Sequence, residues 1–244
     1  MIARVLVSAV LACSLACSLP WRVPKIVTTE NVAEPETRFA VLPLNALGPI
    51  APELIGSGDR VLGRILRYLS VQGHVRFVIE ESTTQRLWLE SVAQVEDSDS
   101  VSHDFRSAIR VFTDKLGEST AFDALVVTSL VYRQATLIRG LAKWDGAVRR
   151  LPKLEDEATR VPDSYRGTIS ALSLHVMVLD PSGALVFESY GGLELAHSFS
   201  LKPGKGGGLG AKLRGTVLGE QRLLDEGVEL AFEPYLPRPR SERW

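Results

Sequence analysis

Apolar and polar positions follow two different periods along residues 38–232. Residues 38–44 (RFAVLPL) form a short, almost unbroken apolar run, which is typical of a strand that is buried on both faces. Over residues 59–73 the apolar positions recur at helical spacing, with Asp59 at the start and Gly73 at the end. The helical stripe consists of Val61, Ile65, Leu66 and Leu69. The pattern predicts a strand, a helix and a second strand over residues 74–80 (HVRFVIE).

Two further helices are predicted after that strand. The first opens at Ser82, and an acidic, Ser-rich turn over residues 96–104 separates it from the second. The first helix carries Leu87, Trp88, Val92 and Val95, and the second carries Phe105, Ala108, Ile109, Phe112 and Leu116 as one stripe.

Strands dominate the next part of the chain. Residues 122–134 and 137–150 are each predicted as a strand. Residues 167–180 alternate, Asp180-Pro181-Ser182-Gly183 has the composition of a tight turn, and residues 184–195 return, which predicts a hairpin. The last predicted element is an amphipathic helix at about residues 216–232, with Val217, Leu224, Val228 and Ala231.

The order of these elements predicts the fold class. Strand–helix alternation (βαβαα) comes first, and an antiparallel meander with a C-terminal helix follows. This order indicates an α/β protein of the α+β kind, with a single mixed β-sheet flanked by helices. We expect one domain over residues 38–232, followed by a Pro/Arg-rich tail over residues 233–244.

The N-terminal residues have a different pattern. A short, weakly basic start (Met1 to Arg4) precedes an apolar run over residues 5–12, and small residues follow. This order is typical of a secretory signal peptide. Pro20, Pro24 and a polar stretch after them argue against a buried first helix.

Both cysteines of the chain lie in the stretch LACSLACSLP, residues 11–20. A disulfide between residues four apart would close no structural loop, and a metal site would need further Cys or a nearby His, whereas the nearest His is His74. The stretch resembles the lipobox of bacterial lipoprotein signals, which ends in a Cys that becomes diacylated. Cys17 gives the better signal length and is favoured; Cys13 is the alternative, because Val10 is the better residue at the position three before it.

This resemblance implies an anchored protein. Residues 1–17 would be the signal peptide, and residues 18–37 would be a flexible tether between the lipid and the domain. Because Ser follows either Cys and Asp does not, the resemblance implies an outer-membrane lipoprotein on the periplasmic face.

Few residues suggest chemistry within the domain. The net charge of −1, from 28 basic and 29 acidic residues, gives no overall field that would attract nucleic acid or anionic lipid. The four histidines are scattered, Asp180 and Asp145 are explained by turns, and the run Glu155–Glu157 is typical of a solvated loop. We therefore expect no catalytic residue, no metal site and no cofactor.

One segment near the C-terminal helix is rich in glycine and lysine. Residues 204–215 (GKGGGLGAKLRG) loosely match a dinucleotide fingerprint but lack the first strand–helix–strand unit that the fingerprint requires. A mobile loop is the favoured interpretation. If it binds anything, we expect a partner protein or an anionic surface, through Lys202, Lys205, Gly206, Gly208 and Lys212.

Residues 38–195 resemble a group of envelope proteins. The features that carry the resemblance are the lipobox, RFAVLPL, LSVQGHVRFVIE, FDALVV and the hairpin LSLHVMVLDPSGALVFES. The group comprises the curli-secretion lipoprotein, the N-terminal domain of the Tol–Pal translocation protein and the lipoprotein activators of penicillin-binding proteins. Where the group has a Phe-x-Asn-like signature, this chain has Pro43-Leu44-Asn45.

The resemblance implies a largely non-enzymatic protein that acts by contact with an envelope protein during assembly or secretion. Two alternatives remain open. One is an oligomeric subunit of a secretion channel. The other is a periplasmic ligand binder or enzyme that uses the loop 204–212.

Overall fold

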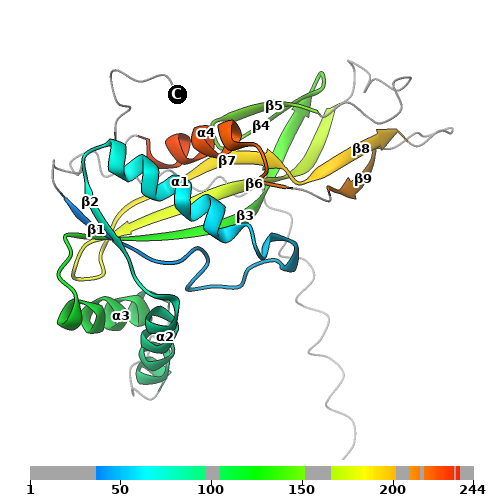
Figure 1. Cartoon of the computed structure of the whole chain (residues 1–244). Coiled ribbons are helices and arrows are strands. Elements are labelled where there is room, and N and C mark those ends of the chain that lie inside the picture. The colour runs from blue at the N-terminus through cyan, green and yellow to red at the C-terminus, as the bar shows by residue number, and fades with distance from the viewer. Residues whose placement is uncertain are drawn as a thin grey trace, which may run out of the picture.

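The computed structural model describes residues 37–96, 105–151, 166–201, 209–214, 217–233 and 235–236. Their main feature is a mixed sheet of seven strands (Figure 1). The first three strands, β1 (Arg38–Val41), β2 (Val75–Val78) and β3 (Ala124–Ile138), are parallel and lie in the order β2-β1-β3. The predicted α/β class with a mixed sheet is confirmed.

The remaining strands of this sheet are antiparallel, and two of them, β4 and β6, pair directly with β3. One side of β3 pairs with β6 (Arg166–Leu179), which pairs with β7 (Leu185–Leu195). The end of β3 also turns into β4 (Leu141–Trp144) and then β5 (Ala147–Arg150). The predicted β6–β7 hairpin is confirmed, and its turn is closed by the Asp180 carboxylate, which accepts hydrogen bonds from the Ser182 and Ala184 backbone N–H groups.

The single strand predicted over residues 137–150 is wrong. Arg139 and Gly140 both have positive φ, and so do Asp145 and Gly146. Two consecutive positive φ values are the signature of a two-residue hairpin turn whose twist matches that of its strands. The chain therefore reverses twice in this stretch, once between β3 and β4 and once between β4 and β5.

Helices cover both faces of the sheet. On one face lie α1 (Gly58–Val71) and α4 (Gln221–Phe232), over a core that includes Val126, Leu174 and Val176. At one end of the other face lie α2 (Glu81–Glu96) and α3 (Phe105–Ser119), over a second core built around Phe112 and Leu125. Figure 1 shows α1 and α4 together on one side of the strands and α2 and α3 on the other. A short 3-10 helix, Pro52–Leu54, precedes α1.

Two details of these helices follow from local backbone geometry. Gly73, with φ of 80°, ends α1 as predicted. The last helix begins at Gln221 instead of about residue 216, because Leu218 has φ of 60° and Glu220 is extended. The packed chain continues past α4, since Tyr235 and Leu236 are buried.

The β4–β5 hairpin curls over the sheet to form a third core. Its tip reaches β7, where the Gly192 N–H donates to the Asp145 carbonyl oxygen at 3.0 Å. A Cβ on Gly192 would lie 2.5 Å from the Ala147 Cβ, so glycine allows this close approach. The Trp144 ring fills the space beneath, and its N–H donates to the Leu172 carbonyl oxygen at 3.1 Å.

Asn45 fills a gap in the sheet beside β3. After β1 the chain bends away, and the Asn45 N–H donates to the Thr128 carbonyl oxygen at 2.9 Å. The Asn45 side-chain oxygen then accepts from the Leu130 N–H at 3.0 Å, as a neighbouring strand would. Asn45 has φ of 59°, a conformation that Asn tolerates better than most residues.

Candidate functional site

Most of the sequence-predicted site residues lie outside the described residues. This holds for both cysteines and for most of the glycine loop, namely Cys13, Cys17, Lys202, Lys205, Gly206 and Gly208. Lys212 is described through its backbone only, in β9 (Leu209–Leu213).

The glycine loop joins two strands that the sequence analysis did not predict. β8 (His197–Leu201) pairs with β9 in an antiparallel sheet of two strands. Figure 1 shows this pair extending away from the main sheet. The sequence gave little signal for this hairpin, because β9 (LGAKL) consists largely of residues that are depleted in strands.

A buried carboxylate fixes the segment that follows β9. Glu194 on β7 is 4% exposed, accepts a hydrogen bond from the Leu218 N–H at 2.6 Å, and pairs with Arg214. An acidic side chain is rarely buried unless it is paired. Glu194 therefore holds the connection between β9 and α4 against the main sheet, and the single sequence gave no signal for this role.

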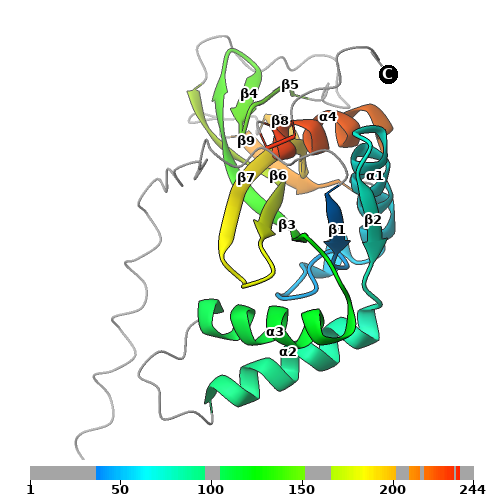
Figure 2. The same ribbon diagram turned by 90° about the vertical axis from the view of Figure 1, so that its left-hand side faces the viewer.

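A polar network joins β3, β6 and β7 to the tip of the β4–β5 hairpin. Figure 2 shows these three strands between α3 and that hairpin. In its first part, Arg133 on β3 donates to the Asp145 carboxylate at 3.1 Å. The Ser173 hydroxyl on β6 donates to the same carboxylate oxygen at 2.7 Å. Asp145 was predicted only as a turn residue. The turn is confirmed, and its carboxylate in addition ties the hairpin tip to β3 and β6.

The second part of the network joins β6 to β7. His175 Nε2 lies 2.9 Å from the Glu188 carboxylate, and the His175 and Tyr190 rings stack at 4.4 Å. Burial lowers the pKa of His175, and the bond to Glu188 opposes this shift. Burial also raises the pKa of Tyr190. The Arg133 guanidinium lies 4.4 Å from the centre of the Tyr190 ring and joins the two parts.

The partners within this network decide what chemistry it supports. A nucleophilic serine needs its hydroxyl within hydrogen-bond reach of a base such as histidine. Here the Ser173 hydroxyl donates to Asp145, whereas His175 pairs with the other carboxylate, Glu188. The geometry is that of a half-buried network that fixes three strands and a hairpin tip relative to one another.

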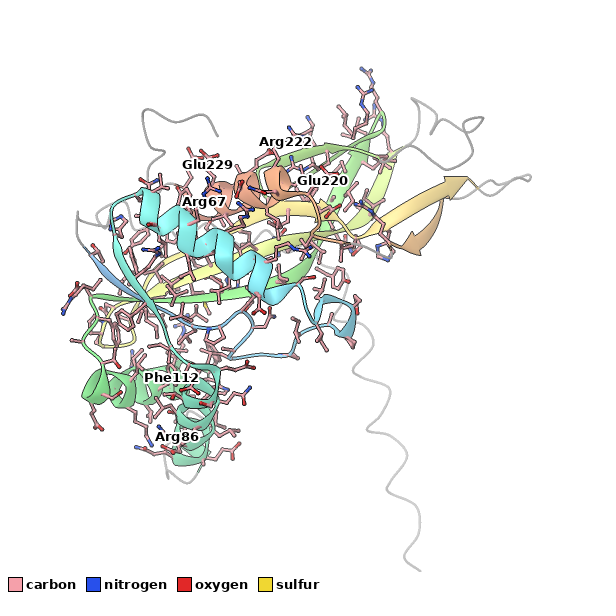
Figure 3. All side chains as sticks on the ribbon, in the orientation of Figure 1. Arg67, Arg86, Phe112, Glu220, Arg222 and Glu229 are labelled. Atoms are coloured by element: carbon pink, nitrogen blue, oxygen red, sulfur yellow. The ribbon has the colours of Figure 1, made fainter. Side chains whose placement is uncertain are left out.

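A cleft opens between α1 and α4 on the opposite side of the sheet. Its volume is about 530 Å³, and its lining is charged. The lining residues are Arg67 from α1 and Gln221, Arg222, Asp225, Glu226 and Glu229 from α4. Figure 3 labels Arg67, Arg222 and Glu229 at this cleft. A smaller hollow next to it reaches down to Tyr68 and Val228.

The lining of the cleft carries charges of both signs. On the α4 side, Arg222 lies among the carboxylates of Asp225, Glu226 and Glu229, and α1 contributes the guanidinium of Arg67. Arg64 on α1 pairs with Asp225 at 3.5 Å. A cleft lined by guanidinium and carboxylate groups offers hydrogen-bond donors and acceptors to a polar protein segment.

The comparisons with known proteins add no relative. No protein-family model matches the chain, and no curated protein is significantly similar to it. Within the described ranges, no three His, Cys, Asp or Glu side chains gather in a way that could hold a metal ion. None of the helices in these ranges is both long and apolar enough to cross a membrane.

Proposed function

We propose that this chain is a lipoprotein of the bacterial envelope whose α/β domain acts by contact with another envelope protein. The observation that carries the proposal is the order of the N-terminal residues: a basic start, an apolar run, small residues and then Cys13 and Cys17. Cys17 is the proposed lipidation site. A diacylated Cys with further acylation gives stable attachment, because each buried CH₂ contributes about 0.8 kcal/mol.

The first residues of the domain support a tether that ends at a fixed point. The Arg38 backbone N–H donates to the Asp123 carboxylate at 2.9 Å, and the Arg38 guanidinium donates to it at 2.7 Å. Asp123 immediately precedes β3, so these bonds fix the start of β1 to the start of the central strand. A pull on the tether would therefore act on β1, which is hydrogen-bonded to β2 on one side and to β3 on the other.

The α1–α4 cleft supports contact with a protein. Its lining combines both charge signs, which favours a partner segment with alternating acidic and basic side chains. Such complementary charges contribute to specificity and association rate more than to affinity. In this proposal the cleft is the contact surface and the network around Asp145 and His175 keeps the sheet rigid.

Lipidation is tested by replacing each cysteine in the full chain, expressed in a Gram-negative host. Labelled palmitate and membrane fractionation are measured for Cys17→Ala, Cys13→Ala and the double variant. We expect Cys17→Ala to lose both label and membrane association, with Cys13→Ala close to the parent chain. The opposite result would move the site to Cys13. Retention of both signals in the double variant would overturn the lipoprotein proposal.

Contact through the cleft is tested by site-specific photocrosslinking in intact cells. A photoreactive residue replaces Gln221 in the cleft, and Glu118, an exposed residue at the end of α3, serves as the matched control position. We expect a discrete adduct from position 221 that Arg222→Glu abolishes, and none from position 118. An adduct at twice the mass of the chain would identify a second copy as the partner. The same bands from both positions would contradict a specific contact at the cleft.

A further inference from the structure

Four exposed cations gather at one end of the main sheet. Arg139 lies in the turn between β3 and β4, Lys143 lies on β4, Arg150 ends β5 and Arg166 begins β6. All four are exposed. We refer to this set as the basic end. It lies at the upper right of Figure 1, where β3, β4, β5 and β6 terminate.

The strand register brings three of these cations to the same face. Arg166 pairs with Ile138, Ile138 with Leu141, and Leu141 with Arg150, so the two arginines close a row across four strands. Lys143 lies in the next-but-one row, between Thr136 and Val148. Since neighbouring strands are about 4.8 Å apart, Arg166 and Arg150 are separated by roughly 14 Å.

The charge at the basic end is not balanced within the described residues. Asp145 is the sole carboxylate in residues 132–150 and 166–179, and Arg133 already pairs with it. Arg149 pairs with Glu226. The ion pairs of the described chain include none of the four cations of the basic end. Among the described residues, this leaves four exposed cations without an ion-pair partner at this end of the sheet.

We propose that the basic end contacts an anionic phospholipid surface. A small anion is bound by cations that converge on one point, often in a bidentate manner. Here the cations are spread over about 14 Å of a sheet face, which suits an extended negative surface. Val148, 49% exposed, lies beside Lys143 and gives this face an apolar contact for the headgroup region.

The tether is long enough for this orientation. The basic end lies at the far end of β3 from Arg38, and 15 residues of β3 span roughly 46 Å. Residues 18–37, fully extended, reach about 66 Å from Cys17. The inference rests on the proposed function for bringing the domain to a membrane, but the affinity of the basic end for anionic lipid does not depend on lipidation.

The test uses the full chain with both cysteines replaced by Ser, so that no lipid anchor contributes. Binding is measured to phosphatidylcholine vesicles with and without about 30% phosphatidylglycerol, at about 0.05 M salt. The ratio of the two affinities cancels the contribution of the apolar N-terminal residues. The variant carries Lys143→Gln, Arg150→Gln and Arg166→Gln. The control, which has the same net charge, carries Arg76→Gln, Arg106→Gln and Arg110→Gln on β2 and α3.

The parent chain and the control are expected to prefer the anionic vesicles, and the variant is expected to lose about 100-fold of that preference. This figure follows from about fivefold per cation. At about 0.5 M salt the preference should disappear for every chain. Far-UV circular dichroism and the unfolding temperature check that each variant is folded.

Three outcomes would overturn the inference. An equal loss in the control would show that net charge alone decides binding. An unchanged variant would exclude the basic end. Binding of the parent chain to an acidic polypeptide but not to anionic vesicles would indicate a protein partner. Loss of the lipid anchor in the cysteine variants is measured separately, so failure of the proposed function and failure of this inference give different results.

Discussion

The contact between β7 and α4 gives the sharpest stability prediction. At Gly191 the strand and the helix touch through their backbones. A Cβ at this position would lie 2.0 Å from the Gly227 carbonyl oxygen and 2.6 Å from the Ala231 backbone nitrogen. Both obstructing atoms belong to the backbone of α4, so no change of side-chain rotamer relieves the overlap. Gly191→Ala therefore requires the helix or the strand to move by about 1 Å or more.

The cost of this movement follows from what α4 buries. Leu224, Val228 and Phe232 are each at most 1% exposed and belong to the core beneath α1 and α4. Close-packed interiors do not absorb such a shift without losing contacts. We expect Gly191→Ala to reduce the free energy of unfolding by about 3 kcal/mol. In a domain of this size this corresponds to a fall of about 6–12 °C in Tm.

A second glycine, in α1, provides a control substitution that should change the free energy of unfolding in the opposite direction. Gly63 is exposed inside the helix, and a Cβ there would meet no atom within 4 Å. Gly63→Ala should raise the free energy of unfolding by about 0.5–1 kcal/mol, because alanine has the higher helix propensity. Urea denaturation of the full chain measures both variants. A Gly191→Ala variant within about 0.5 kcal/mol of the parent would refute this account of the β7–α4 contact.

Two further predictions concern pH. Burial raises the pKa of Tyr235 to about 12. The neutral side chain therefore stabilises the folded state fully below about pH 10, and this contribution is lost as the pH rises to 12. Between these values the parent chain should lose up to about 2 kcal/mol more than Tyr235→Phe in urea denaturation, and equal losses would contradict the assignment. Arg38 lowers the pKa of Asp123 to about 2, so the contribution of that pair is present above about pH 4 and lost as the pH falls toward 2. Both side chains are about half exposed, so the pair should contribute less than about 1 kcal/mol to the free energy of unfolding. Asp123→Asn should reduce the loss of stability on acidification by this amount, and an equal loss in the variant and the parent chain would contradict the role of the pair.

The elements that the sequence predicted well have a strong local signal. The helical stripe of α1 and the terminating Gly73 are encoded within fifteen residues, and the β6–β7 turn is encoded by Asp180 and Gly183. The two reversals over residues 137–150 differ in the strength of their local signal. The Asp145-Gly146 pair is a strong hairpin signal that the prediction of a single strand overlooked, whereas Arg139-Gly140 is not one of the most common turn pairs.

The site features required information that one sequence does not contain. Asp145 meets Ser173 across 28 residues, and His175 meets Glu188 through the register of a hairpin that contains β-bulge irregularities. The basic end exists only because the strand order places Arg150 and Arg166 in one row. Such long-range pairings depend on which strands become neighbours, and apolar periodicity does not determine that choice.

The position of β1 within the sheet has a consequence for the order of folding during synthesis. The first strand of the domain lies between β2 and β3, and its partner Ala124 is made 85 residues after Phe39. The core over β1 is completed only by α4, near the end of the described chain. A chain that emerges N-terminus first therefore cannot pair β1 with β3 until 85 further residues have been made, and cannot complete this core until α4 has emerged. Under the proposed function, in which the chain crosses a membrane unfolded, this topology would delay completion of the core until α4 has passed.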